Sequence, residues 1–130
     1  MIEFLFIKVT QKLHIHSSDL SGKTFDNLNL SNAVFYKTDL SYSSFKNTIL
    51  DGAILKGANL TGANLIDVEF RRGVDLRDVK LTRANLGGTK LIGANLRGAN
   101  LKRTYFVNAD LTGANLRGAN LRGAALGGVR

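Results

Sequence analysis

Leucine or phenylalanine occupies every fifth position through most of this chain of 130 residues. The series runs from Leu20 to Phe70 and, after one extra residue, from Leu76 to Leu126, which makes eleven plus eleven central positions. A period of five fits neither the 3.6-residue turn of an α-helix nor the two-residue alternation of a strand, so either element would scatter these side chains over all its faces. Stacked short repeats can instead gather them in one shared interior.

Within each five-residue unit the side chains alternate. Two positions before most centres stands a small or β-branched residue, and the residue between is usually polar, as in Ala114-Asn115-Leu116. In an extended segment these three side chains point alternately inward, outward and inward, as expected of a short strand. The next pair, such as Arg117-Gly118, is polar and flexible enough to turn a corner, where an outward Asn or Asp can hydrogen-bond the backbone. Each unit is therefore predicted to form one side of a tube.

The number of sides follows from a longer repeat. The stretch LIGANLRGANL at 91–101 recurs as LTGANLRGANL at 111–121, a separation of 20 residues or four sides. Tandem A(N/D)LxG units resemble the pentapeptide-repeat family over about residues 13–126. The resemblance implies an all-β right-handed quadrilateral β-helix, a solenoid with four pentapeptides per coil and about five and a half coils. It also implies a rigid surface that binds other proteins, since most members have no known biochemical activity.

We expect one pentapeptide-repeat domain over residues 1–130. Residues 1–12 are predicted to form a strand-like cap on the first coil, with a dimer-forming or exposed edge as the alternative. Residues 13–126 carry the repeats, and 127–130 form a tail. The extra residue predicts a bulge near 71–73, interpreted as structural accommodation, with a recognition point as the alternative. The last coil is expected to have an open edge, which leaves a homodimer through this coil and a monomer with a fraying end as alternatives.

The net charge of +8 belongs to the second half of the chain. Residues 1–70 contain six Lys or Arg and seven Asp or Glu, giving −1, whereas residues 71–130 contain twelve and three, giving +9. Four sides per coil bring several of these cations into register. The predicted partner-binding ridge consists of Lys56, Arg77, Arg97 and Arg117 on one corner and, on the adjoining side, Lys102, Arg122, Arg83 and Arg103.

Such a ridge can attract an acidic protein, nucleic acid or an anionic membrane surface. It can also be a solvated face without a partner, since two exposed like charges about 5 Å apart repel by only about 0.8 kcal/mol in water. Tyr105 is the one aromatic residue expected near the ridge, which disfavours nucleic acid. Tyr36 and Tyr42, in the near-neutral half, are candidates for a separate contact, with exposed strand tyrosines of no special role as the alternative. Family members that act on DNA gyrase imitate DNA with an acidic rod, so a charge of +8 disfavours that activity.

Catalysis is not expected, because the pattern places apolar residues inside and polar residues on convex faces, without a pocket. No catalytic or cofactor-binding residue is predicted. Two carboxylate pairs, Asp67 with Glu69 and Asp75 with Asp78, stand among Lys and Arg and are interpreted as parts of a surface charge network.

The remaining sequence features bear on metal binding and location. His14 and His16 flank Ile15, but no third ligand stands nearby, so no metal site is predicted. The chain has no cysteine, and its apolar stretches are too short for a membrane span, which favours a soluble cytoplasmic protein. The sequence thus favours a non-enzymatic protein-interaction scaffold, with a polyanion binder that uses the basic ridge as the alternative.

Overall fold

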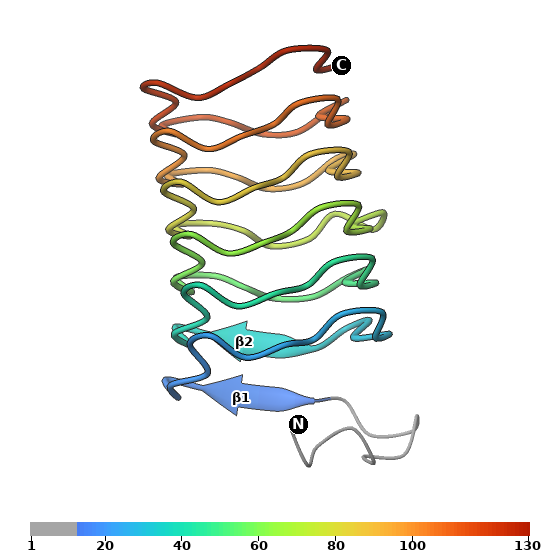
Figure 1. Cartoon of the computed structure of the whole chain (residues 1–130), viewed down its shortest axis with the longest axis vertical. Coiled ribbons are helices and arrows are strands. Elements are labelled where there is room, and N and C mark those ends of the chain that lie inside the picture. Colours follow the sequence, from blue (N-terminus) through green and yellow to red (C-terminus); the bar gives the residue numbers. More distant parts are fainter. Residues whose placement is uncertain (1–12) are drawn as a thin grey trace.

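The computed structural model describes residues 13–130, so the cap predicted for residues 1–12 lies outside the described residues. The chain winds into a right-handed, four-sided β-helix whose coils stack along one axis (Figure 1). Parallel bridges join residues one coil apart, as Asn29 joins Ile49 and Asn95 joins Asn115. The separation of 20 residues confirms four five-residue sides per coil.

Two short strands lie at the start of the described chain. Strand β1 spans His14–His16 and strand β2 spans Val34–Tyr36. They pair in parallel, with Ile15 opposite Phe35, and lie one above the other in Figure 1. Elsewhere each side contributes single bridges, because the corners leave only about three extended residues between turns.

The interior holds the central residues of every side in vertical columns. In the first half, the Phe25 and Phe45 rings stack with centroids 4.6 Å apart, and Phe35 packs edge-on against both. In the second half, leucines such as Leu81 and Leu101 are fully buried. Burying one such side chain contributes about 1.5–3 kcal/mol, so this core is the main source of stability.

Buried threonines fill some of the small inward positions and tie neighbouring coils together. The Thr48 hydroxyl donates to the Phe25 carbonyl at 2.7 Å, and the Thr104 hydroxyl donates to the Leu81 carbonyl at 2.7 Å. Within residues 13–130, every buried side-chain nitrogen and oxygen has a hydrogen-bond partner. The polar residues inside the tube are therefore compatible with its apolar packing.

The extra residue is absorbed at one corner. Ile49 pairs with Glu69, 20 residues on, whereas Ile54 pairs with Asp75, 21 residues on. The added residue lies in a three-residue turn at 71–73, where Gly73 has a φ of +59°. Beyond this turn the 20-residue register resumes with Asp75 and Asn95, so the insertion leaves the neighbouring sides intact.

The last coil is less buried than the coils below it. Leu116 and Leu121 are half-buried, and Leu126 is 47% exposed, whereas their counterparts in the middle of the rod are fully buried. Within residues 13–130, no helix has the length and apolar character that a membrane span requires.

Candidate functional site: a basic side of the rod

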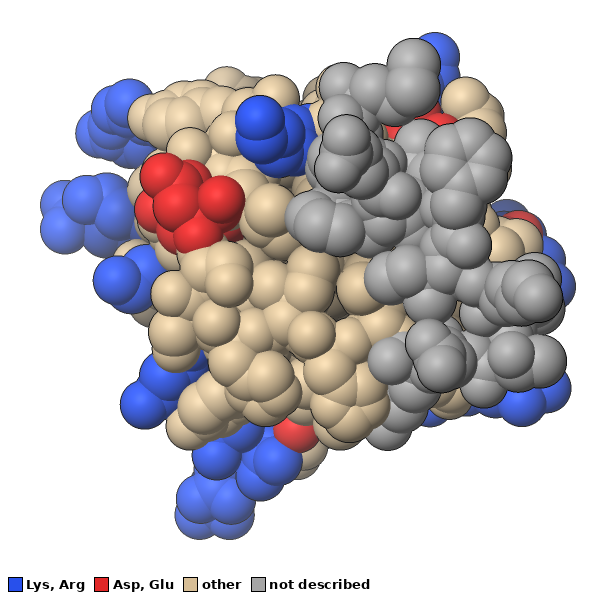
Figure 2. All heavy atoms as spheres, turned by 90° about the horizontal axis from the view of Figure 1, so that it is seen from below, with Lys and Arg blue, Asp and Glu red and all other residues tan. Residues whose placement is uncertain are grey.

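The predicted cations lie on two neighbouring corners that border one side of the rod. We call this the basic side; its outward residues are Asp19 and Asp39 in the first coils, followed by Asn59, Lys80, Asn100 and Asn120. The corner before it carries a vertical column, the first basic column, made of Lys56, Arg77, Arg97 and Arg117. The corner after it carries two adjacent rows, Lys102 with Arg122 and Arg83 with Arg103. Viewed along the rod axis, Lys and Arg side chains project from the outline of the molecule (Figure 2).

Backbone hydrogen bonds between coils set the spacing within each column. The Asp78 N–H donates to the Arg97 carbonyl, and the Gly98 N–H donates to the Arg117 carbonyl, both at 3.0 Å. Stacked strands lie about 4.8 Å apart, so the backbones that carry these cations repeat at that interval.

Outward asparagines hold the backbone of four of the predicted cations, which are Arg97, Lys102, Arg117 and Arg122. The Arg117 N–H donates to the Asn115 Oδ1 at 3.1 Å, and the Arg122 N–H donates to the Asn120 Oδ1 at 3.1 Å. Lys102 is held in the same way by Asn100. These turns confirm the capping role expected for asparagine, and they hold the backbone of the basic residues rigidly while the charged side chains remain in solvent.

One predicted cation is engaged within the molecule. The Arg77 guanidinium donates two hydrogen bonds to Asp75, at 2.8 and 2.7 Å. These hydrogen bonds lower the pKa of Asp75 below its ordinary value, and partial burial opposes them with a smaller effect. Because Arg77 is committed to Asp75, the first basic column offers its charge mainly through its other members.

The other predicted cations have no carboxylate partner within residues 13–130. The ion pairs in this part of the chain join Arg77 to Asp75 and join Glu69 to Arg71 and Lys90. The seven predicted cations outside these pairs are Lys56, Arg83, Arg97, Lys102, Arg103, Arg117 and Arg122. Their charges are available to an anionic ligand.

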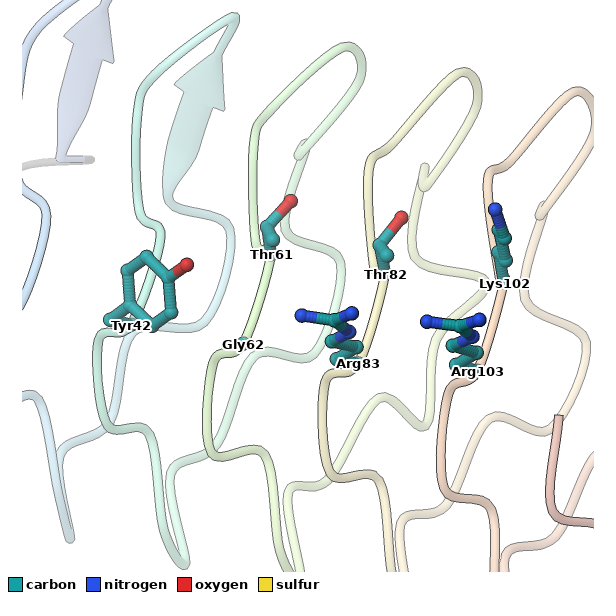
Figure 3. Close-up of a pocket in the computed structure, with 7 residues that line it drawn as sticks. All are labelled: Tyr42, Thr61, Gly62, Thr82, Arg83, Lys102 and Arg103. Carbon is teal, nitrogen blue, oxygen red and sulfur yellow. The ribbon is translucent and has the colours of Figure 1, made fainter. Parts of the chain in front are cut away.

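The structure also joins an unexpected tyrosine to these cations. Tyr42, Gly62, Arg83 and Arg103 occupy equivalent positions of successive coils at the corner after the basic side (Figure 3). Tyr42 is 72% exposed, and its ring lies so close to Gly62 that a Cβ there would be 2.7 Å from Cδ1 and Cε1. Tyr42 therefore lies in the column of Arg83 and Arg103, at the corner after the basic side.

A shallow pocket of about 170 Å³, which we call the Tyr42 pocket, lies along this corner. Tyr42 bounds one end, Gly62 leaves a gap in the row of side chains, and the guanidinium groups of Arg83 and Arg103 follow in parallel (Figure 3). The other lining residues are Thr61, Thr82 and Lys102. The corner thus combines an aromatic ring, hydroxyl groups and three cations.

Comparison with protein families agrees with this architecture. The model of pentapeptide repeats matches eight copies, over residues 15–52, 38–72, 72–98 and 94–130. The chain belongs to the pentapeptide-repeat family.

Solved structures of other pentapeptide-repeat proteins are similar. A protein from the thylakoid lumen of Arabidopsis thaliana is 34% identical over 78% of this chain and 70% of its own, with a TM-score of 0.74. Rfr23 from the cyanobacterium Cyanothece is 25% identical over 86% of each chain, with a TM-score of 0.64. No curated protein matches the sequence significantly.

At the corner after the basic side, large side chains occupy positions where the backbone conformation favours glycine. The second residue after a centre adopts a left-handed conformation at every described corner except the one after Phe70, where the third residue, Gly73, does so. Glycine is the least strained choice for this conformation. Gly62 has a φ of +66°, but Tyr42, Arg83 and Arg103 have φ values of 57°, 59° and 58° in the same column. Non-glycine residues hold the same conformation at other corners, as Asn27, Lys37 and Asn108 do, so this strain is shared around the rod.

Of the carboxylates singled out in the sequence, Asp67 and Glu69 line a further surface pocket of about 380 Å³ together with Lys90. Glu69 contacts Arg71 and Lys90, and Asp75 contacts Arg77, whereas Asp67 and Asp78 make no ion pair within residues 13–130. Within the described residues, no group of three His, Cys, Asp or Glu side chains is arranged to hold a metal ion.

Proposed function

We propose that this protein is a rigid, non-enzymatic scaffold whose basic side binds an acidic surface of another protein. The observation that carries the proposal is the set of seven cations without carboxylate partners in residues 13–130, ordered on two corners of one side. Their backbones are fixed by the ladder of coil-to-coil hydrogen bonds and by the asparagine turns. A preorganised surface loses little conformational entropy on binding, which supports recognition by a flat face.

The chemistry of the side favours an acidic partner. Complementary charge accelerates encounter and fixes register, and arginine is the cation best suited to bidentate contact with carboxylates. The convex, polar outer surface supports binding by contact area and charge, whereas catalysis needs converging groups in a concavity.

Charge reversal on two sides of the rod tests this function. One variant carries Arg97→Glu and Arg117→Glu, which change the first basic column and leave the Tyr42 pocket intact. The matched control carries Lys46→Glu and Arg72→Glu, which make the same change in net charge at other corners. Proteins captured from nuclease-treated lysate of the source cells are quantified by mass spectrometry for both variants and the wild type.

The proposal expects an acidic protein that the wild type and the control retain and that the Arg97→Glu, Arg117→Glu variant loses. Its affinity should also fall as salt rises from about 50 to about 200 mM, because the contacts are between exposed charges. Capture that is equal in all three proteins would overturn the assignment of the basic side.

A further inference from the structure

We propose that the Tyr42 pocket is a binding site for a nucleotide unit of single-stranded nucleic acid, with the base against the Tyr42 ring and phosphates on Arg83, Arg103 and Lys102. This inference goes beyond the proposed function, because it assigns a second class of ligand to one corner of the basic side. Seven residues line the pocket, and they combine a ring with cations and hydroxyl groups.

The ring is placed where a base can reach it. Tyr42 is 72% exposed and extends toward Gly62 of the next coil, which has no side chain to cover it. Stacking of a base on an exposed aromatic ring is tolerant of sequence, since every base has a flat π-face. An unpaired strand is required, because the bases of a duplex already stack on one another.

The cations follow the Tyr42 ring along the rod axis, so a nucleic-acid strand whose base contacts the ring can run past them. Arg83 follows Gly62 by one coil and Arg103 follows Arg83 by one coil, so their backbones are about 4.8 Å apart. Their guanidinium groups lie in parallel, with Lys102 beside Arg103 (Figure 3). None of the three has an ion-pair partner within residues 13–130. A phosphate can therefore take hydrogen bonds from these side chains without breaking an internal ion pair.

The combination distinguishes nucleic acid from an acidic peptide. A run of carboxylates would neutralise Arg83 and Arg103 but would leave the Tyr42 ring exposed. Each nucleotide carries both a phosphate and a flat ring, so one strand satisfies both parts of the pocket.

The test compares two labelled strands. Fluorescence anisotropy measures binding of a single-stranded oligothymidylate of about 12 nucleotides and of an abasic strand of the same length, at about 50 and about 200 mM salt. The wild type is expected to bind the thymidylate strand about tenfold more tightly than the abasic strand, since stacking contributes to the former alone. Tyr42→Ala should abolish this preference, and Tyr42→Phe should keep it.

Matched controls separate the ring and the charges from general effects. Tyr105→Ala, which removes an exposed ring outside the pocket, should leave the preference unchanged. Gly62→Ala should reduce it by displacing the Tyr42 ring, whereas Gly113→Ala introduces a Cβ at a similar φ of +69° with no atom nearer than 3.9 Å. Arg83→Gln with Arg103→Gln should weaken binding of both strands. It should also lower the slope of log affinity against log salt by about 0.7 for each phosphate that these side chains neutralise in the wild type.

Three outcomes would overturn the inference: no binding at the lower salt, equal affinity for both strands, or a preference that Tyr42→Ala leaves intact. Binding of a labelled peptide of about 12 glutamates is measured in the same way, with the wild type and with Tyr42→Ala. If Tyr42→Ala weakens binding of the peptide as much as binding of the thymidylate strand, the pocket recognises acidic protein and the nucleotide assignment fails. The charge-reversal test of the scaffold changes Arg97 and Arg117 instead, so the two proposals can fail separately.

Discussion

Residues 13–70 and residues 76–130 build the same coil from different side chains. The first part packs Phe25, Phe35 and Phe45 together and has a near-neutral surface, whereas the second packs leucine against alanine and is strongly basic. Both parts keep the same parallel register. The comparison teaches that the tube constrains the volume of its inward positions and leaves its outward positions able to carry almost any charge.

The sharpest test of this comparison is the removal of an aromatic ring from the first half. Phe45→Ala should lower the free energy of unfolding by about 3–5 kcal/mol, because the ring is fully buried and contacts two other phenylalanines. Leu126→Ala, at a central position that is 47% exposed in the last coil, should cost less than about 1 kcal/mol. Urea unfolding followed by circular dichroism measures both. Equal losses of stability would mean that the aromatic rings of the first half are not tightly packed.

A smaller effect should be shared by both halves. Thr48→Val and Thr104→Val each remove a buried hydroxyl that donates to a carbonyl of the preceding coil. We expect each change to cost about 1 kcal/mol, the net contribution of one hydrogen bond. Thr24→Val, at an exposed threonine whose hydroxyl makes no hydrogen bond within residues 13–130, is the control for the change of side chain. Unlike values for Thr48 and Thr104 would show that the two halves differ inside as well as outside.

The smallest effect concerns the surface pair Asp75–Arg77 and depends on pH. Because the pKa of Asp75 is lowered in the folded protein, the pair stabilises the fold above the ordinary carboxyl pKa of 3.8. That contribution is lost as the pH falls through the lowered value. Unfolding of the wild type and of Asp75→Asn should therefore differ at about pH 6 and converge by about pH 2. A difference that persists at the acidic end would assign the effect to packing rather than to charge.

Much of this architecture could be predicted from the sequence, because the fold repeats at a fixed interval. With four sides per coil, the positions of Arg97 and Arg117 in one column follow from counting. Asn95 and Asn115 stand two residues before these arginines and indicate the corner, and the contacts of their Oδ1 atoms with the arginine N–H groups agree.

Two features of the site could not be obtained by adding up charge along the chain. Such a sum places Tyr42 in the near-neutral half, although the spacing of 42, 62, 83 and 103 puts it in the column of Arg83. Arg77 could turn toward solvent or toward Asp75, and its choice depends on side-chain geometry that periodicity does not encode. In a coil of this kind, neighbours on the surface are twenty or twenty-one residues apart in the sequence. Residues that share a surface are therefore identified from this spacing, and a comparison of contiguous segments does not reveal them.

The near-identity of residues 91–101 and 111–121 has a consequence for how such a chain can change in evolution. From residue 75 onward, a gene segment of twenty codons encodes one whole turn of the rod. Unequal recombination between the two stretches would add or delete one turn and join every remaining turn in its original alignment. The length of the molecule can thus change in steps of one turn, about 4.8 Å each, and each added turn brings its own pair of arginines.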